Sequence, residues 1–268
     1  MAASIDSFLN SFNTKFEAPV RSHLKNVYAS LTMTVASATI GAYVHLFTNI
    51  LRGGGLLFSL VAVGLALGLH FNPDNGKNRG QRLAMLLGFG FLTGLGMGPL
   101  LQMAMMMNPS IVPTAFLVSA TIFGCFTGAS LMAPDGKYLY LGGTLMSGLS
   151  TLMWLGLLNI FFRSQLLFQV RAVTQTIQFF KVKNQAHIWI GLAVFCGFIM
   201  FDTQMIIRKA RMGDKDFIAH SLDLFIDFVQ VFRKVLILLM QKVRKAIIEF
   251  KYLLPVVLWL QGFKKGKL

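Results

Sequence analysis

Three aspartates interrupt stretches of sequence that are otherwise apolar. Asp202 follows the run Cys196-Gly-Phe-Ile-Met-Phe201, and Asp223 and Asp227 lie within the segment 220–232. An ionisable group inside an apolar helix is costly and therefore marks a candidate functional site. The spacing of four residues places Asp223 and Asp227 on one face of a helix. If that face packs against the helix that carries Asp202, two carboxyl groups meet where water is scarce.

Two such carboxyl groups cannot both be ionised at low cost, so they are expected to share one proton and to titrate as a unit. The pair would sense protons near neutral or mildly acidic pH. Once deprotonated, it would repel itself or attract a divalent cation, and carboxylate oxygens suit calcium. We therefore predict that Asp202 and Asp227 form a pH sensor and gate that binds calcium transiently, with Asp223 as an accessory carboxylate. The alternative is that each aspartate reaches the membrane interface or pairs with a nearby cation, namely Arg208, Lys209 or Arg233.

The composition indicates the surroundings of these acids. Of 268 residues, 55% are hydrophobic and 13% are charged, and the mean hydropathy is +0.63. A soluble domain carries about 25% charged residues, so a typical cytosolic enzyme and a disordered protein are excluded. Two cysteines also exclude a disulfide-rich scaffold. The composition predicts a multi-pass helical protein whose main partner is the lipid bilayer.

Apolar runs of about 20 residues are long enough to cross a bilayer. They are expected at residues 28–50, 54–71, 83–107, 111–133, 138–162, 188–207 and 218–241. Polar turns separate several of these runs and make neighbouring helices antiparallel. The sequence therefore predicts an all-α polytopic membrane bundle of about seven transmembrane helices. Glycines crowd the third run, including Gly94-x-x-x-Gly98, and predict close helix packing there.

The chain is strongly basic, with 25 Lys and Arg against 10 Asp and Glu and a formal net charge of +15. Cytoplasmic loops of membrane proteins carry an excess of Lys and Arg, and by this rule the cations before residue 28, in 72–82 and in 208–215 indicate a cytoplasmic amino terminus. The cations in 163–187 and in the carboxyl tail indicate the opposite orientation. Two arrangements reconcile them: six full spans with a re-entrant seventh, or seven spans with the tail opposite the amino terminus. Because no basic stripe interleaves with aromatic residues on a polar face, nucleic acid is not an expected partner.

These patterns divide the chain into three parts. Residues 1–27 form an amino-terminal cytoplasmic segment, residues 28–241 form the transmembrane domain, and residues 242–268 form a basic, partly apolar tail. The tail has the composition of an amphipathic segment that lies on a membrane surface.

Catalytic motifs are missing from the sequence. It contains no phosphate-binding loop, no zinc-ligand spacing and no Gly-x-Ser-x-Gly turn. Ser130 together with His187 or His220 is a weak candidate for an intramembrane serine protease, because nothing ties either histidine to that serine. We therefore predict a protein that is not an enzyme and has no resident cofactor, with calcium only as a permeant ion.

Five motifs along the apolar segments are highly specific in combination. They are Gly98-Pro-Leu-Leu-Gln102, Asn108-Pro-Ser-Ile-Val-Pro-Thr-Ala-Phe116, Leu141-Gly-Gly-Thr-Leu-Met-Ser147, Cys196-Gly-Phe-Ile-Met-Phe-Asp-Thr-Gln204 and Asp223-Leu-Phe-Ile-Asp-Phe-Val-Gln-Val-Phe-Arg-Lys234. Together they resemble the Bax inhibitor-1 family, the transmembrane BAX inhibitor motif-containing proteins, over roughly residues 5–241.

The resemblance implies a seven-helix bundle with a central last helix in the endoplasmic reticulum membrane. Members of the family suppress cell death and lower store calcium through a pH-sensitive leak. Their paired aspartates correspond to Asp202 and Asp227, whereas Asp223 matches an acidic position outside the pair. In bacterial relatives, an arginine that follows the second helix pairs with the two aspartates. Three cations of this chain lie near the corresponding position, but none aligns cleanly enough to be assigned that role: Lys77, Arg79 and Arg82.

Two regions depart from the family pattern. An atypical insertion lies near 170–184, and the tail is apolar over 246–263 where family tails are short and polar. Both departures lie outside the motifs above, so they leave the expected bundle intact.

The leading hypothesis is a pH-sensitive calcium leak channel that negatively regulates apoptosis and is gated by Asp202 and Asp227. A shared proton favours closure at low pH, whereas release of the basic tail favours opening there, so the direction is left open. The alternative is a membrane adaptor that binds Bcl-2-type apoptosis regulators or other calcium channels and affects calcium indirectly. A proton-coupled transporter is a third possibility, which an imposed pH gradient driving uphill calcium movement would distinguish.

Overall fold

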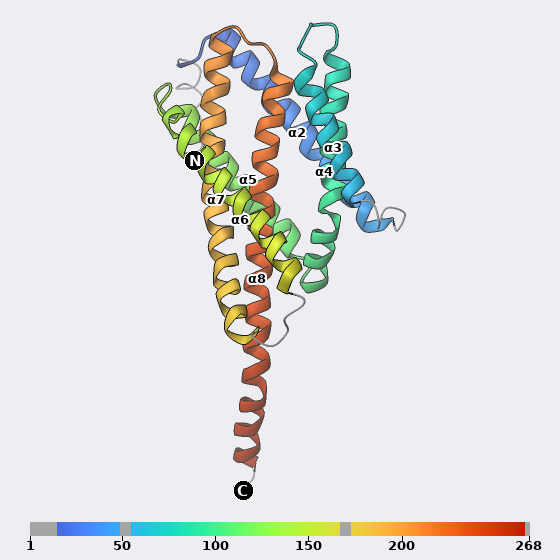
Figure 1. Cartoon of the computed structure of the whole chain (residues 1–268), viewed down its shortest axis with the longest axis vertical. Coiled ribbons are helices and arrows are strands. Elements are labelled where there is room, and N and C mark those ends of the chain that lie inside the picture. The colour runs from blue at the N-terminus through green and yellow to red at the C-terminus, as the bar shows by residue number, and fades with distance from the viewer. Residues whose placement is uncertain (1–14, 49–54, 167–172, 266–268) are drawn as a thin grey trace.

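The computed structural model describes residues 15–48, 55–166 and 173–265, with most side chains placed over 15–48, 57–154 and 187–245. These residues contain seven α-helices, one short 3-10 helix (η2, Leu139–Leu141) and no strand. The α-helices are α2 (Ala18–Phe47), α3 (Gly55–Phe71), α4 (Arg79–Met107), α5 (Ile111–Met132), α6 (Gly142–Leu166), α7 (Val173–Arg211) and α8 (Phe217–Lys265). They run up and down as a bundle (Figure 1), which confirms the predicted all-α class.

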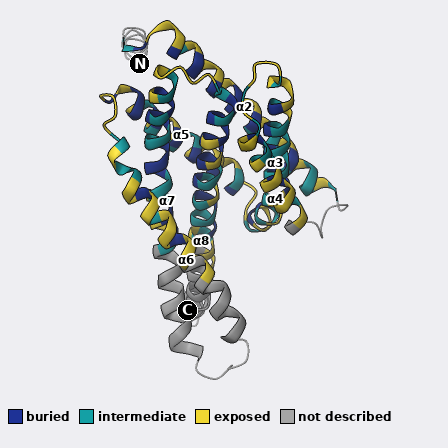
Figure 2. Cartoon of the chain, turned by 45° about the horizontal axis from the view of Figure 1, so that its top comes forward, coloured by how far each residue is buried: buried dark blue, intermediate teal, exposed yellow. Residues whose placement is uncertain are grey.

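Several helices are suited to a membrane. Helices α2, α4 and α5, and α7 over His187–Arg211, are long and apolar enough to cross a bilayer, and α3 is apolar over Leu57–Phe71. Large apolar side chains such as Ile40, Leu60 and Leu117 are exposed, and exposed residues line the outside of the bundle (Figure 2). An apolar exterior of this kind faces lipid rather than water. The chain is therefore a multi-pass membrane protein.

The last helix, α8, lies at the centre of the bundle. It packs against α2, α4, α5 and α7 and also contacts α3. The Phe225 ring meets Phe89 of α4 edge-on with 5.7 Å between ring centroids, and Phe228 meets Phe123 of α5 in the same way at 5.7 Å. Because its neighbours shield it from lipid, α8 can carry ionisable side chains that an outer helix could not carry at low cost.

Helix α8 is also continuous, with 49 residues from Phe217 to Lys265. Over its described residues it does not double back, so no re-entrant turn interrupts this helix. Below the bundle it continues as helix toward the carboxyl terminus (Figure 1). The tail over 246–263 therefore prolongs α8 instead of forming a separate segment.

The backbones of α2 and α4 are in direct contact, as the glycines predicted. A Cβ atom built on Gly94 would lie 1.9 Å from the carbonyl oxygen of Ala38, and one on Gly41 would lie 2.1 Å from that of Phe91. The Ser37 hydroxyl donates across the same contact to the Leu87 carbonyl at 2.8 Å. Any side chain at Gly41 or Gly94 would push the two helices apart.

Two helices begin earlier than predicted. Helix α2 begins at Ala18 rather than at residue 28, because Val20 and Leu24 are buried in the core and extend the packed face. Helix α7 begins at Val173, so the insertion is helical over 173–184, where no Gly or Pro interrupts it. Residues 170–172 of the predicted insertion lie outside the described residues.

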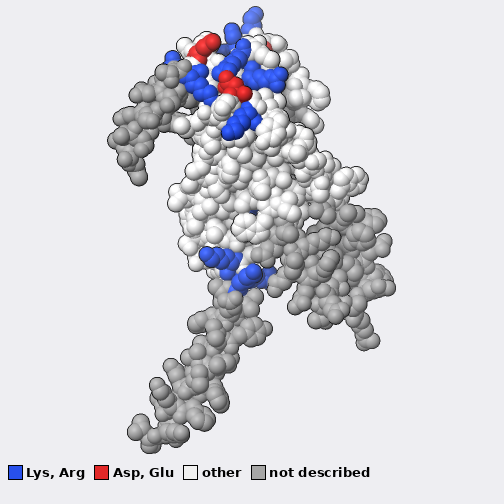
Figure 3. All heavy atoms as spheres, turned by 90° about the vertical axis from the view of Figure 1, so that its left-hand side faces the viewer, with Lys and Arg blue, Asp and Glu red and all other residues white. Residues whose placement is uncertain are grey.

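Charged side chains gather at one end of the bundle. The turns 72–78, 133–138 and 212–216 lie there together with residues 15–17 (Figure 1), and we call this the charged end. Figure 3 shows a broad uncharged band below it and a second basic group near the opposite end. The amino-terminal, 72–82 and 208–215 cations thus share one end, as predicted, and the tail leaves from the other.

Candidate functional site

The packing of α7 against α8 brings Asp202 and Asp227 together. Their carboxyl groups are in hydrogen-bond contact with each other. Asp227 is 4% exposed, and Asp202 is partly buried. Two of the three acids singled out by sequence spacing therefore meet inside the bundle.

No cation among the described side chains forms an ion pair with Asp202 or Asp227. The buried Oδ2 atom of Asp227 has no hydrogen-bond partner among them either. The positive charge of Lys209, further along α7, acts on Asp202 without forming an ion pair with it. Two carboxyl groups that neighbour each other away from water cannot both be ionised at low cost, so a single proton shared between them is favoured. The geometry can thus hold one proton, join α7 to α8 through it, and offer oxygen ligands once the proton leaves.

Asp223 does not join the pair. It lies one turn before Asp227 on α8, is exposed, and has no hydrogen bond to Asp202 or Asp227. It acts on both only through its charge, and the positive charge of Lys209 acts on it in turn. An accessory role therefore stays a prediction.

The three acids differ from a typical metal-binding cluster in the number of ligands that they bring together. The part of the chain that the structure describes contains no cluster of three or more His, Cys, Asp or Glu side chains able to hold a metal ion. Calcium takes about 6–8 oxygen ligands, and Asp202 with Asp227 supplies only the two carboxyl groups. This donor set suits a passing ion that keeps most of its water, and calcium binding stays a prediction.

A second buried charge lies at the charged end of the bundle. Arg82, 1% exposed, donates from both terminal nitrogens to Asp216, at 2.7 Å and 2.6 Å. Asp216 also accepts the Ala219 backbone N–H at 3.1 Å and thereby caps α8. Burial alone would raise the pKa of Asp216, but the hydrogen bonds from Arg82 and Ala219 outweigh it and hold that pKa below its usual range. The arginine left unassigned from sequence therefore fixes the start of α8 and does not touch Asp202 or Asp227.

Two buried histidines connect α2 to α8 beside this ion pair. The Nε2 atom of His23 lies 2.9 Å from the Nδ1 atom of His220, and Nε2 of His220 lies 3.6 Å from Asp214. One more link follows on α8, where the Ser221 hydroxyl donates to the Val27 carbonyl at 2.9 Å. One ring must donate and the other accept, so a hydrogen bond between the rings requires at least one unprotonated nitrogen. Sequence analysis missed this pair because 197 residues separate its members.

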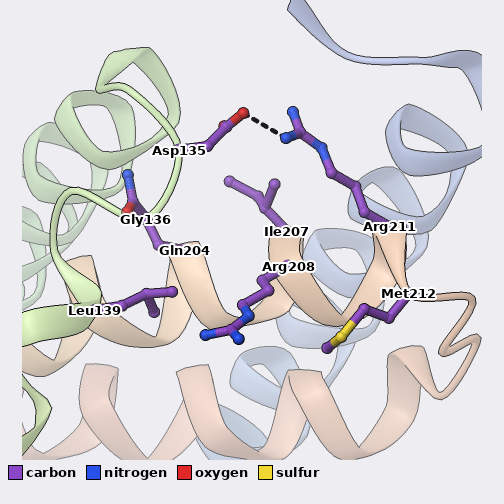
Figure 4. A pocket seen from close by; sticks show the side chains of 8 residues that line it. All are labelled: Asp135, Gly136, Leu139, Gln204, Ile207, Arg208, Arg211 and Met212. Carbon is purple, nitrogen blue, oxygen red and sulfur yellow. Dashed lines mark hydrogen bonds and ion pairs between the residues drawn. The ribbon is translucent and has the colours of Figure 1, made fainter.

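Gln204, two residues after Asp202, forms hydrogen bonds to the turn between α5 and α6. Gln204 donates to the Pro134 carbonyl at 3.0 Å and accepts the Tyr138 backbone N–H at 3.0 Å. A pocket of about 380 Å³ lies beside it, with Asp135 and Arg211 paired on one side and Arg208 on the other (Figure 4).

The weak serine protease candidate gains no support from the structure. The Ser130 hydroxyl donates to the Met200 carbonyl at 2.8 Å. His220 pairs with His23, and His187 lies 3.5 Å from the Leu152 carbonyl. Neither histidine is therefore positioned to activate Ser130.

Comparison with known proteins identifies close relatives. A family model described as an inhibitor of apoptosis-promoting Bax1 matches residues 20–244. Bax inhibitor 1 of Homo sapiens is 46% identical over 217 residues, which cover 81% of this chain and 84% of the human protein. Bax inhibitor 1 of Drosophila melanogaster is 38% identical over 88% of this chain and 89% of its own length, and that of Arabidopsis thaliana is 38% identical over 83% and 82%.

Proposed function

The chain belongs to the Bax inhibitor-1 family, and from that premise we propose that it is an anti-apoptotic protein of the endoplasmic reticulum membrane through which calcium leaks in a pH-sensitive way. The observation that carries the proposal is the contact between Asp202 and Asp227 inside the bundle. The names of its relatives support the link to apoptosis, and its apolar helices support the membrane setting.

In the closed state, one proton bridges Asp202 and Asp227 and joins α7 to α8 by a hydrogen bond. Because α8 is the central helix, this hydrogen bond also stabilises the packing of α8 against its other neighbours. The bridge needs no enzymatic step and no resident metal. The closed state is therefore favoured at acidic pH, where the bridging proton is retained.

Loss of the proton leaves two negative charges in contact in a poorly solvated place. Repulsion then favours separation of α7 from α8, which admits water and cations. Calcium passes because the ionised carboxylates attract it without completing its coordination shell. The leak therefore rises as pH rises through the titration of the pair.

Calcium flux from liposomes that contain only the purified protein tests this mechanism. The Asp202→Asn variant keeps a side-chain amide that can donate to Asp227 but cannot release the bridging hydrogen. We expect its flux to stay low and to lose the pH dependence seen with the unsubstituted chain. Asp135→Asn, at the charged end, is the matched control and should keep the normal profile.

Other outcomes separate the alternatives. An Asp202→Asn variant with unchanged flux and an unchanged pH profile would exclude gating by the pair. No intrinsic flux at any pH would exclude the leak and favour an adaptor that acts through apoptosis regulators or other channels. Uphill calcium movement driven by an imposed pH gradient would identify a proton-coupled transporter instead.

A further inference from the structure

A groove of about 440 Å³ lies between α5, α7 and α8, away from the aspartate pair. Its walls are aliphatic side chains contributed by all three helices: Val118, Ile122, Leu192, Val235, Leu238 and Leu239. Because the groove lies on a bundle with an apolar exterior, a hydrocarbon chain can enter it directly from the bilayer.

One end of the groove is polar and positively charged. Lys242 and Lys245 lie three residues apart on α8, both are exposed, and no described carboxylate pairs with either. Trp189 of α7 lines the same groove and is 55% exposed. Tryptophan favours the boundary between hydrocarbon and headgroups, and lysine reaches past that boundary with its ammonium group.

This combination selects one kind of occupant. An apolar trough that ends in two unpaired cations complements a molecule with a hydrocarbon chain attached to a negatively charged head. A free phosphate ion would gain nothing from the aliphatic walls, and a zwitterionic lipid would gain little from the two lysines. Basic pockets between transmembrane helices bind anionic headgroups for the same reason.

We propose that this groove is a binding site for an anionic phospholipid. One acyl chain lies along α5, α7 and α8, and the phosphate contacts Lys242 and Lys245. A lipid bound there bridges three helices, including the two that carry Asp202 and Asp227, and so adds to their packing. The site does not depend on the proposed calcium leak and can be tested without measuring flux.

Trp189 provides a direct probe of occupancy. The chain has three tryptophans, so the Trp154→Phe/Trp259→Phe variant leaves Trp189 as the sole tryptophan, which can be excited selectively over the tyrosines. We would place this full-length variant in vesicles of phosphatidylcholine and phosphatidylglycerol, with bromine on the acyl chains of one lipid at a time. The relative quenching gives the preference of the groove for the anionic lipid. We expect brominated phosphatidylglycerol to quench more strongly at equal mole fraction.

Charge variants then test the headgroup contact. Lys242→Gln and Lys245→Gln should each reduce the preference by roughly fivefold, the effect of one cation near an anionic surface. Lys242→Arg/Lys245→Arg should retain the preference, and Lys215→Gln, at the charged end, is the control that should leave it unchanged. Millimolar inorganic phosphate should not relieve the quenching.

Three results would overturn the site. These are equal quenching by both brominated lipids, a preference that survives loss of both lysine charges, and displacement of the lipid by inorganic phosphate. Only variants that elute as a single species in size-exclusion chromatography would be used, so that loss of fold is not read as loss of binding.

Discussion

The buried acids differ in what balances their charge. Asp216 faces Arg82, whereas the neighbour of Asp227 is another carboxyl group. The ion pair lowers the pKa of Asp216, so its stabilising effect is present above the usual aspartate pKa of about 3.9 and disappears only as pH falls through the lower, folded-state value. Across the range from neutral to mildly acidic pH, the Arg82–Asp216 pair is therefore constant, and pH sensitivity must arise elsewhere.

We expect the Asp216→Asn variant to lose much stability. Asparagine still caps α8, but the Arg82 guanidinium is left buried without a counter-charge, which costs about 3–5 kcal/mol. Thermal unfolding of the purified protein in detergent measures the loss. Because the pair stays ionised, the loss should be equal at about pH 5.5 and about pH 7.5.

A nearby ion pair whose arginine is about half exposed is the matched control. Arg79 lies 3.2 Å from Asp74 and its side chain is 49% exposed. Removal of its charge by Arg79→Gln should cost no more than about 1 kcal/mol, since surface pairs are screened by solvent. Similar losses for the two variants would contradict a special role for the buried pair.

At the level of single residues, sequence reasoning could find an acid but not its partner. The spacing of Asp223 and Asp227 on an apolar helix marked them as unusual, and the structure places Asp227 against Asp202. The partners Arg82 and Asp216 are 134 residues apart, and no local pattern relates them. The only local signal was the position of Asp216 just before the apolar start of α8, which is typical of a helix cap.

Among the helices, the α2–α4 contact depends most directly on small residues. We expect Gly94→Ala to destabilise the bundle, because the new Cβ would lie 1.9 Å from the Ala38 carbonyl oxygen and must separate the helices. Overpacking of this kind costs about 1–3 kcal/mol. The melting temperature in detergent measures the change.

Gly96 on the same helix provides the comparison. A Cβ at Gly96 has no neighbour within 4 Å, so Gly96→Ala should leave the melting temperature unchanged or raise it slightly, since alanine favours helix. If Gly96→Ala lowered stability as much as Gly94→Ala, the close contact at Gly94 would not be the cause of the loss.

Helix positions could be predicted from the apolar runs, but two helix starts could not. The first turns of α2 mix polar residues with the buried Val20 and Leu24, so hydropathy alone placed the start too late. Residues 173–184 are polar enough to resemble a loop, yet they continue α7. In both cases the helix outlasts its apolar run, because backbone hydrogen bonding propagates as long as no breaker interrupts it.

On the scale of the whole molecule, polar contacts concentrate at one end. The Arg82–Asp216 ion pair and the His23–His220 contact fasten α2 and α4 to the start of α8. The aspartate pair lies further down α8, where no described salt bridge adds to its contact with α7. We therefore expect any separation of α7 from α8 to pivot about the charged end.

One hydrogen ion held between Asp202 and Asp227 is the feature on which the proposed gating depends, and infrared spectroscopy detects it most directly. A protonated carboxyl group absorbs apart from ionised carboxylates. The purified protein at mildly acidic pH should show one such band that is lost in Asp202→Asn and in Asp227→Asn, and kept in Asp135→Asn. Absence of the band, or its persistence in both pair variants, would show that no proton is shared there.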